Sequence, residues 1–469
     1  MEHAVVIGGG IGGLASALAL GRGGHRVTLL ERDVLPAVDD PEAAFAAERR
    51  GAPQVHQTHG FLARLQVTLR DRFPDVFDDL LNAGCYTMST TANLGDPQPG
   101  DEDLKVIIVR RTTLEWVLRR AVLAQPGVDV RSGTGVVGLL GGRADGAGAV
   151  PLVNGVALED GTTVEADLVV AANGRRSAMP TWLGELGVEV PERVRESGLM
   201  YVTRWYRLPG HRQIELDPKL GGDLGFVKYL AVPGDGGTLS VTLAIRSDDV
   251  ELRGALADDG RFDLACRNLP GPDRFFEAGP LQPIGGVRPM GGLLNRTRSF
   301  VDAGGQPTVL GFHAVGDAHT CTNPLYGRGC ALAVVQAVFL ADALAAHPDD
   351  PAARATAYEA ACARDVAPWY DVSVQMDQLG ADPTGVASSA EGTAMARVFV
   401  AAQTDPVIGR AIVKFWNLMS TPADLAIDAV LLARMAAVMA DPDSYPIPPQ
   451  EGPTRDELLA KLATEEDAA

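Results

Sequence analysis

The first 31 residues contain two short apolar runs separated by a helix-like segment. HAVVIG (residues 3–8) and HRVTLLE (25–31) are short and rich in β-branched residues, and LASALALGRGG (14–24) lies between them. Continuous apolar runs of this length are typical of strands in a parallel sheet with both faces buried. The pattern therefore predicts a strand–helix–strand unit at the start of the chain.

Further apolar runs extend this α/β pattern. KVIIVRRTTLEWVLRRAVLA (105–124) predicts a strand followed by a helix that opens with a capping box of Thr112 and Glu115, and VDVRSGTGVVGLL (128–140) predicts one strand. GVALEDGTTVEADLVVAANG (155–174) predicts a hairpin and then a buried strand. TVLGFHAVGD (308–317) returns to a buried strand.

The pattern changes between about residues 201 and 287. YVTRWYRL (201–208), GFVKYLAV (225–232) and GTLSVTLAI (237–245) are short β-rich runs separated by Gly and Pro turns. They predict an antiparallel sheet inserted into the α/β domain. Alternation along the first run would place Tyr201, Thr203 and Trp205 on one face.

The last third of the chain is Ala-rich and reads as helical. LAIDAVLLARMAAVMA (425–440) predicts one packed helix in preference to a membrane-surface helix, because it lacks a basic face. The predicted fold is α/β, with a Rossmann-like domain, an inserted antiparallel-sheet domain and C-terminal helices. The predicted boundaries are 1–185 with 288–345, 186–287, and 346–469.

Composition narrows the function classes. Of 469 residues 46% are hydrophobic and 22% charged, as in a globular protein, and the net charge of −19 without a basic cluster argues against a nucleic-acid partner. The five cysteines form no CxxC motif, so neither a zinc site nor a disulfide framework is supported, and a cytoplasmic location fits. We expect no signal peptide, no membrane span and no metal.

The turn after the first predicted strand carries a dinucleotide-binding fingerprint. Gly8, Gly10 and Gly13 form G-x-G-x-x-G, and Glu31 follows 18 residues after Gly13. Gly8 permits the tight turn, Gly10 lets a diphosphate approach the backbone, and Gly13 lets helix and strand pack closely. Glu31 can accept hydrogen bonds from the adenosine ribose. The fingerprint does not separate FAD from NAD.

A second glycine-rich segment precedes a long apolar stretch. GDAHTCTNPLYGRGC (316–330) is followed by ALAVVQAVFLADAL (331–344). Glycines at a helix N-terminus allow backbone N–H groups to approach an anion, although the same residues also make an ordinary helix-capping turn.

The order of these motifs resembles that of the class A flavoprotein monooxygenases, the group of para-hydroxybenzoate hydroxylase. RRGAPQVHQTHGFLARL (49–65) is similar to a segment of bacterial FAD-dependent epoxidases and hydroxylases, including the polyether epoxidases. GDAHTCTNPLYGRGCALA (316–333) is similar to the Gly-Asp segment of those enzymes and of squalene epoxidase. The motifs span residues 1–345.

This resemblance implies roles for individual residues. Arg111 would reach the FAD diphosphate, and Asp317 would bind the ribityl and diphosphate part. Gly327 and Gly329 would bring N–H groups to the flavin pyrimidine ring, and Pro324 would lie beside the flavin. The candidates for cofactor binding are Gly8, Gly10, Gly13, Glu31, Arg32, Arg111, Asp317, Gly327 and Gly329, and those for catalysis are Pro324, Gly327 and His59.

The chain departs from the family pattern at three positions. Asn173-Gly174 replaces the usual Asp-Gly, and Gln57 stands where the first His of the PQ…H.H stretch is expected, which leaves His59 as the match. His319 occupies a position where the family often has another residue. On sequence alone His59 and His319 are each either active-site groups or structural histidines.

The resemblance implies oxygenation through a C4a-hydroperoxyflavin, with NAD(P)H or a separate flavin reductase as the electron source. The substrates would be O2 and a small apolar organic compound, which would be hydroxylated or epoxidised, as in secondary metabolism. The enzyme alternative is an FAD-dependent dehydrogenase or reductase of prenyl-like or polyketide-like substrates. A halogenase would need a W-x-W-x-I-P signature, of which RWYRLP (204–209) has one Trp. A non-catalytic FAD-binding protein is the remaining class.

Overall fold

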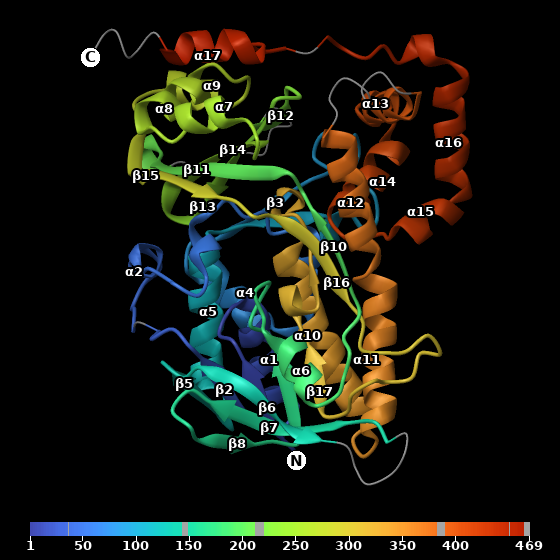
Figure 1. Ribbon diagram of the computed structural model, residues 1–469. Coiled ribbons are helices and arrows are strands. Elements are labelled where there is room, and N and C mark those ends of the chain that lie inside the picture. The colour runs from blue at the N-terminus through green and yellow to red at the C-terminus, as the bar shows by residue number, and fades with distance from the viewer. Residues whose placement is uncertain (36, 143–148, 212–219, 382–389, 450, 464–469) are drawn as a thin grey trace.

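The predicted strand–helix–strand unit lies at the centre of a five-stranded parallel sheet in the lower half of Figure 1. The computed structural model describes residues 1–463 except 36, 143–148, 212–219, 382–389 and 450. The strand order is β17 (Phe312–Ala314), β9 (Leu168–Ala171), β1 (His3–Ile7), β2 (Arg26–Glu31) and β5 (Val128–Ser132). All neighbours are parallel, which confirms the Rossmann-like prediction.

Both faces of this sheet are covered. Ala4 and Val6 pack in a core with helices on one face, whereas Val5 and Ile7 pack against a small antiparallel sheet on the other. The helices of the first face include α1 (Ile11–Arg22), α3 (Ala63–Arg72), α4 (Pro74–Asn82), α5 (Arg111–Ala124) and α10 (Gly329–Ala346). The other face carries β6 (Val136–Gly142), β7 (Leu152–Leu158), β8 (Thr163–Glu165) and α6 (Met179–Glu185).

A second five-stranded sheet lies above the first in Figure 1 and is antiparallel throughout. Its order is β12 (Gly221–Asp223), β13 (Val227–Gly234), β14 (Thr238–Arg246), β11 (Leu199–Arg207) and β15 (Gln282–Met290). Val202 and Tyr206 point into a core with α7 (Val250–Ala255), α8 (Asp259–Arg267) and α9 (Asp273–Glu277). The predicted alternation therefore holds, and the other face turns toward the parallel-sheet half.

Smaller strands join the two halves. A three-stranded antiparallel sheet runs along the side of the molecule in the order β10 (Glu192–Glu196), β16 (Leu294–Arg298) and β18 (Thr320–Cys321). A two-stranded ribbon pairs β3 (Tyr86–Ser89) with β4 (Lys105–Ile108). The short helix α2 (Pro41–Ala46) packs beside α5.

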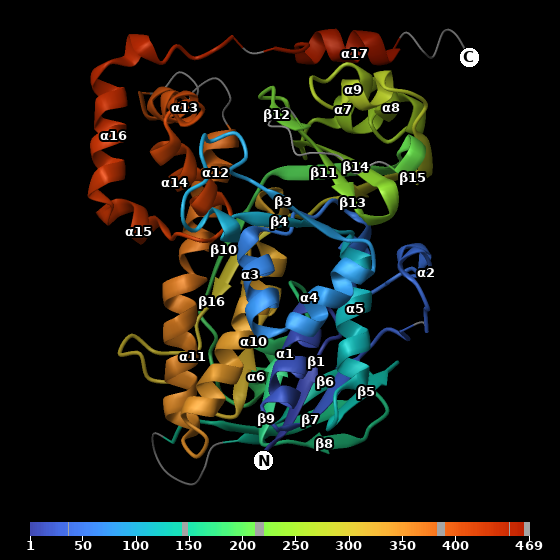
Figure 2. The same cartoon turned by 180° about the vertical axis from the view of Figure 1, so that it is seen from behind.

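The C-terminal part is helical, as expected, and reaches both halves of the molecule (Figure 2). Its helices are α11 (Pro351–Asp365), α12 (Pro368–Ala381), α13 (Ala390–Ala402), α14 (Pro406–Trp416), α15 (Pro422–Ile427), α16 (Ala429–Ala440) and α17 (Arg455–Ala463). Leu458 and Leu462 of α17 pack into the core of the antiparallel sheet. Helix α17 therefore packs on the helical side of the inserted domain.

Three local predictions were wrong. The run 128–140 is two strands in different sheets, because the chain turns at Gly133, where φ is +68°. The run 425–440 is two helices divided at Asp428, which caps α16, and Ile427 and Val430 are largely exposed. Thr112 and Glu115 form no capping box, because α5 begins at Arg111 and has Arg110 as its N-cap.

The core helix α10 qualifies the expectation of no membrane span. Among the described residues it is the one helix that is long and apolar enough to cross a bilayer, yet 67% of it is buried inside the protein. Helix α10 packs against α1 in the main core of the fold.

Candidate active site

The fingerprint glycines make close contacts at the turn from β1 to α1. Gly8 has φ +105°, and a Cβ there would lie 2.7 Å from the carbonyl oxygen of Ala172, the residue that follows β9. A Cβ on Gly13 would lie 1.8 Å from the Gly8 carbonyl oxygen, so helix and strand could not pack with a larger residue. Gly10, by contrast, faces open space at the uncapped N-terminus of α1.

Glu31, at the end of β2, is a buried acceptor beside this turn. Its Oε2 accepts from the Gly9 N–H at 2.6 Å, and its Oε1 accepts from the Asp33 N–H at 2.8 Å. Arg49 approaches Glu31 at 3.4 Å and also pairs with Glu115 of α5 at 3.1 Å. An ionised carboxylate has about four acceptor positions, so Glu31 retains capacity for a ribose hydroxyl. Arg32 is exposed.

The second glycine-rich segment meets the first in space. A Cβ on Gly12 of α1 would lie 3.5 Å from Val315 and 4.0 Å from the Gly316 Cα. Asp317 follows in a 3₁₀ turn, and a Cβ on Gly329 would lie 3.7 Å from its Oδ1. The two glycine motifs, about 300 residues apart in the sequence, therefore form one continuous surface.

The loop of residues 323–329 completes this surface. Gly327 has φ +66°, and a Cβ on it would lie 3.4 Å from the Gly60 carbonyl oxygen. Pro324 is exposed, although it begins a short 3₁₀ turn. The 323–329 loop thus packs against Gly60, the residue that follows His59.

Arg111 and His59 form a hydrogen-bonded pair at this point. Arg111 donates from Nη1 to His59 Nε2 at 3.0 Å and from Nε to Glu115 at 3.0 Å. His59 Nδ1 lies 2.9 Å from the Gln57 carbonyl oxygen, to which it must donate. These partners require the neutral imidazole with its proton on Nδ1. Burial, and then the Arg111 charge, lower the pKa of His59 to about 3.

Asp317 lies close enough to Arg111 to interact with its positive charge. Burial raises the pKa of this carboxyl, whereas the charges of Arg111 and Arg175 act to lower it. Asp317 and Arg111, both predicted from the family resemblance, are thus brought together with Gly329 and His59. A polar ligand at this site would meet one acidic and one basic group.

Residues 56–58 attach the antiparallel sheet to the site. Trp205 donates from Nε1 to the His56 carbonyl oxygen at 2.7 Å, and Thr203 donates to Gln57 Oε1 at 2.7 Å. The Thr242 hydroxyl contacts that of Thr58 at 2.7 Å. Gln57, which departs from the family pattern, therefore anchors the face of the sheet that covers the site.

His319 lies in a different environment. It is 3% exposed, packs against Phe300 and Tyr358, and approaches Glu359 at 3.6 Å. Its contacts are those of a structural histidine. All five cysteines are buried and unpaired, and among the described residues no group of His, Cys, Asp and Glu could hold a metal ion.

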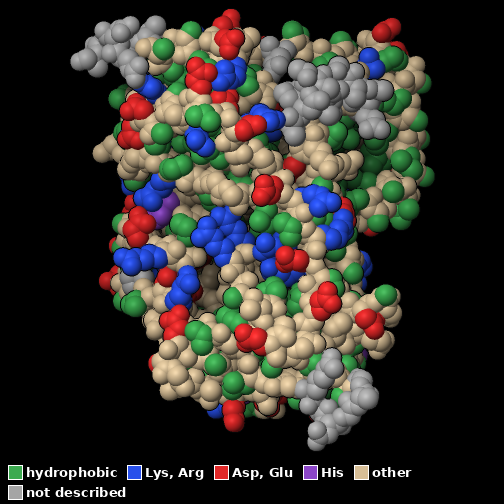
Figure 3. All heavy atoms as spheres, viewed as in Figure 1, with side chains coloured by type: hydrophobic (Ala, Val, Ile, Leu, Met, Phe, Trp, Pro, Cys, Tyr) green, Lys and Arg blue, Asp and Glu red, His purple; other side chains and the backbone are tan. Residues whose placement is uncertain are grey.

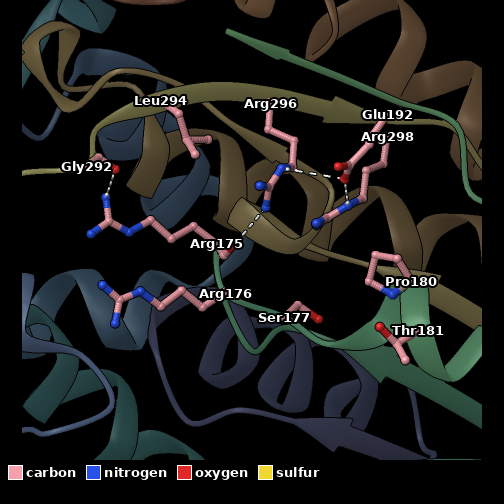
Figure 4. Close-up of a pocket in the computed structure, with 10 residues that line it drawn as sticks. All are labelled: Arg175, Arg176, Ser177, Pro180, Thr181, Glu192, Gly292, Leu294, Arg296 and Arg298. Carbon is pink, nitrogen blue, oxygen red and sulfur yellow. Dashed lines mark hydrogen bonds and ion pairs between the residues drawn. The ribbon is translucent and has the colours of Figure 1, made fainter. Parts of the chain in front are cut away.

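A basic pocket of about 360 Å³ opens beside Asn173-Gly174. Arg175 and Arg176 lie side by side along one wall, and Arg296 and Arg298 of β16 extend from the other (Figure 4). Glu192 is the one acidic residue among those that line it, and it pairs with Arg298 at 3.1 Å. Blue side chains gather around a hollow near the middle of the face in Figure 3.

The residues present fit an extended dinucleotide such as FAD. An uncapped helix N-terminus at Gly10 faces open space, Glu31 has free acceptor capacity, and Arg111 supplies positive charge. The Asn173 Oδ1 atom is buried without a hydrogen-bond partner beside the Gly8 turn. The ion pairs of Arg49 and the anchoring contacts of Gln57 could not be predicted from the sequence, because they join segments that are distant along the chain.

Comparisons with known proteins agree with this geometry. The family model described as FAD dependent oxidoreductase matches residues 3–92. Protein Rv3254 of Mycobacterium tuberculosis is 29% identical over 74% of this chain and 73% of its own. Kynurenine 3-monooxygenase of Salinispora arenicola is 28% identical over 77% of this chain and 76% of its own.

The fold is also found among solved structures. The p-nitrophenol 4-monooxygenase PnpA from Pseudomonas putida DLL-E4 superposes with a TM-score of 0.62 at 19% identity, and the match covers 90% of this chain and 99% of PnpA. The glycine motifs, the inserted sheet and these matches together make the chain similar to FAD-dependent oxidoreductases, and its fold is that of a known FAD-dependent monooxygenase structure.

Proposed function

We propose that the protein is a monooxygenase that inserts one oxygen atom from O2 into a small organic substrate by hydroxylation or epoxidation. The observation that carries this proposal is the meeting of the two glycine motifs beneath the antiparallel sheet. One extended FAD would join the Gly8–Gly13 turn to the 323–329 loop. When bound and reduced, FAD supplies the electrons and the centre at which O2 is activated.

The chain's own residues would bind and orient the cofactor. Gly10 and the N-terminus of α1 would take the diphosphate, Glu31 the adenosine ribose, and Asp317 the ribityl part. Arg111 would hold its charge toward the diphosphate while the neutral His59 fixes its orientation. Gly327 and Gly329 would donate backbone N–H groups to the flavin pyrimidine ring, beside Pro324.

The substrate would lie between the flavin and the antiparallel sheet. A pocket of about 300 Å³ is lined in part by Leu199, Leu325, Val374 and Met376. Leu325 belongs to the 323–329 loop, so this pocket adjoins the proposed flavin position. The apolar part of an organic molecule would contact these four side chains, and its polar groups would meet the charged residues that also line the pocket, such as Lys228 and Asp248. The inserted sheet would keep water away from the reacting atoms.

We further propose that a nicotinamide dinucleotide reduces the flavin directly. The basic pocket has four arginines against one glutamate, in a chain whose net charge is −19. Burial, and then the neighbouring Arg296, lower the pKa of Arg298, so an anion in the pocket would relieve repulsion. NAD(P)H carries such anionic groups, which favours it over a separate reductase.

We assign residues 1–185 and 288–345 to flavin binding, 186–287 to the substrate and 346–469 to the C-terminal helices. A cytoplasmic location fits the five unpaired cysteines, which are stable as thiols in a reducing compartment.

The test is a product screen under isotopically labelled O2, with NADH, NADPH or a separate flavin reductase as the electron source. We expect one labelled oxygen atom in the product, and the other in water. A reductase would saturate a double bond and leave the product unlabelled. If no electron source gives labelled product, oxygenation is wrong and the dehydrogenase or reductase alternative replaces it.

A further inference from the structure

A buried carboxylate from the C-terminal helices lies directly behind the 323–329 loop. Asp377 of α12 is 8% exposed and accepts hydrogen bonds from Asn295 Nδ2 at 2.6 Å, Asn323 Nδ2 at 2.8 Å and the Tyr326 hydroxyl at 2.7 Å. A carboxylate at this depth is costly unless its oxygens are hydrogen-bonded. Three donors, from β16 and the loop itself, meet that requirement.

The two asparagines leave one consistent arrangement of donors and acceptors. Asn323 Oδ1 accepts from the Leu325 N–H at 3.1 Å and from the Tyr201 hydroxyl, so its amide NH2 must donate. Asn295 Oδ1 accepts from the Asn323 N–H at 2.7 Å, so its NH2 must donate as well. Both NH2 groups point at Asp377, which therefore accepts a hydrogen bond from each amide.

Helix α12 also holds the other end of the loop. Arg328 is 0% exposed and donates to the Ser373 hydroxyl at 2.8 Å, four residues before Asp377 on the same helix. Its guanidinium lies 4.8 Å from the ring centre of Tyr326 and 4.9 Å from that of Trp369. One face of α12 thus fixes the residues on both sides of Gly327.

Burial raises the pKa of Asp377, whereas the hydrogen bonds from Tyr326, Asn323 and Asn295 and the charge of Arg328 act to lower it. Asp377 also lines the pocket of about 300 Å³ beside Leu325. Its three side-chain hydrogen bonds come from β16 and the 323–329 loop, so its contacts within the protein are directed at the loop and its neighbouring strand.

We propose that Asp377 is a positioning residue for the flavin: it fixes Asn323 and Tyr326, and through them holds Gly327 and Gly329 in the conformation that binds FAD. This proposal rests on the assignment of the 323–329 loop to the flavin ring. Without the carboxylate, three buried donors lose their acceptor and the loop can adopt other conformations. FAD binding would then have to order the loop, at a cost in affinity.

The test compares FAD binding by Asp377→Asn with that by the wild-type chain. The substitution keeps the shape of the side chain but replaces one acceptor oxygen with an NH2 group that faces other donors. We expect at least a tenfold increase in the FAD dissociation constant and a shifted visible spectrum of the bound flavin. Asp371→Asn is the matched control, because Asp371 lies on the same helix in an exposed pair with Arg193.

A second variant, Tyr326→Phe, removes one donor and keeps the carboxylate. We expect a smaller loss of FAD affinity, about threefold, with the same direction of spectral change. Lower thermal stability with an unchanged dissociation constant and spectrum in Asp377→Asn would overturn the proposal, because that is the result of a purely structural role. If Asp377→Asn does not fold, an unchanged constant and spectrum in Tyr326→Phe overturn it equally. A wild-type chain that binds no FAD would overturn the flavin site itself.

Discussion

Asp317 and Arg111 carry opposite charges at the point where the two glycine motifs meet. Asp317 interacts with Arg111 and Arg175, and it lies beside the Gly329 backbone. A carboxyl in this position can accept hydrogen bonds from a polar ligand, and the charges of Arg111 and Arg175 oppose the rise in its pKa that burial causes. The family resemblance predicted Asp317 and Arg111 as site residues, whereas it did not point to Arg175.

Asp317→Ala should weaken FAD binding by about ten- to a hundredfold, because a hydrogen bond to a charged group contributes about 1.5–3 kcal/mol. Fluorescence titration of the FAD-free chain measures the dissociation constant. Asp342→Ala is the control, since Asp342 lies on α10 and forms an exposed ion pair with Arg72 of α3. Equal affinity in both variants would mean that Asp317 is only a turn residue.

Gly327→Val should abolish oxygenation. The residue has φ +66°, a conformation that a β-branched side chain rarely adopts, and a Cβ would approach Gly60 at 3.4 Å. The valine would also project toward the proposed flavin position. Product formation is the readout, and Gly305→Val is the control, because Gly305 has φ +78° in an open turn. Full activity in Gly327→Val would show that this glycine is not needed for oxygenation.

His59 should make the protein less stable in acid. Its pKa is about 3 in the folded chain, whereas an unfolded chain binds the proton near pH 6.5, so the unfolded state gains protons first as the pH falls. Stability should therefore decrease from about pH 6.5 downward, by up to about 1.4 kcal/mol per pH unit from this one residue.

His59→Gln can keep both hydrogen bonds but does not titrate. Urea unfolding with saturating FAD, from about pH 7 to about pH 5, should therefore show a shallower loss of stability in this variant than in the wild type. The same slope in both proteins would contradict a histidine that the folded chain keeps neutral.

Some site residues have no local signal in the sequence. Gly8, Gly10, Gly13 and Glu31 could be predicted because their roles depend on a local strand–turn–helix pattern. Arg49 acts through Glu31 and Glu115, and Asp377 acts through residues more than 50 positions away. No periodicity or spacing reports such contacts, so the structure was required to find them.

Helix α5 and the antiparallel sheet are joined by a buried ion pair. Asp235 is 1% exposed and accepts from the Arg110 N–H at 2.6 Å, from its guanidinium at 2.8 Å and from the Thr113 hydroxyl at 2.8 Å. The pair holds the start of α5, and therefore Arg111, at a fixed position relative to the sheet. The position of the flavin site relative to the antiparallel sheet above it therefore depends on this ion pair.

Asp235→Ala should destabilise the protein by about 3–5 kcal/mol, because it leaves most of the donors of a buried arginine without an acceptor. Urea unfolding measures the change. Asp248→Ala, which breaks an exposed pair with Arg246 at the end of β14, should leave the free energy of unfolding nearly unchanged. Similar losses in the two variants would show that the buried pair does not join the elements.

Element types were predictable from the chain, but some boundaries were not. The runs 3–8, 25–31 and 237–245 are strands as expected, because their apolar patterns are long and regular. The run 128–140 divides at Gly133, where a positive φ sends the second half into another sheet. Asp428 divides the run 425–440 by capping a new helix, and apolar periodicity alone does not mark that position.

At the scale of the whole molecule, three parts meet at one site. The parallel-sheet half supplies the Gly8–Gly13 turn, the antiparallel sheet covers it through Trp205, and α12 holds the 323–329 loop from behind. The first two parts follow from the order of motifs and strands. The contact with α12 could not be predicted, because a helical, Ala-rich pattern does not indicate which surface it packs against.

The central claim is that one FAD joins two glycine motifs that are distant in the sequence. The most direct measurement is to denature the purified yellow protein and to identify the released flavin by chromatography and mass. We predict non-covalent FAD, one per chain, because Glu31 and the Gly8–Gly13 turn are placed to bind the adenosine end. Release of FMN, which lacks adenosine, or no flavin even after incubation with FAD, would contradict the account.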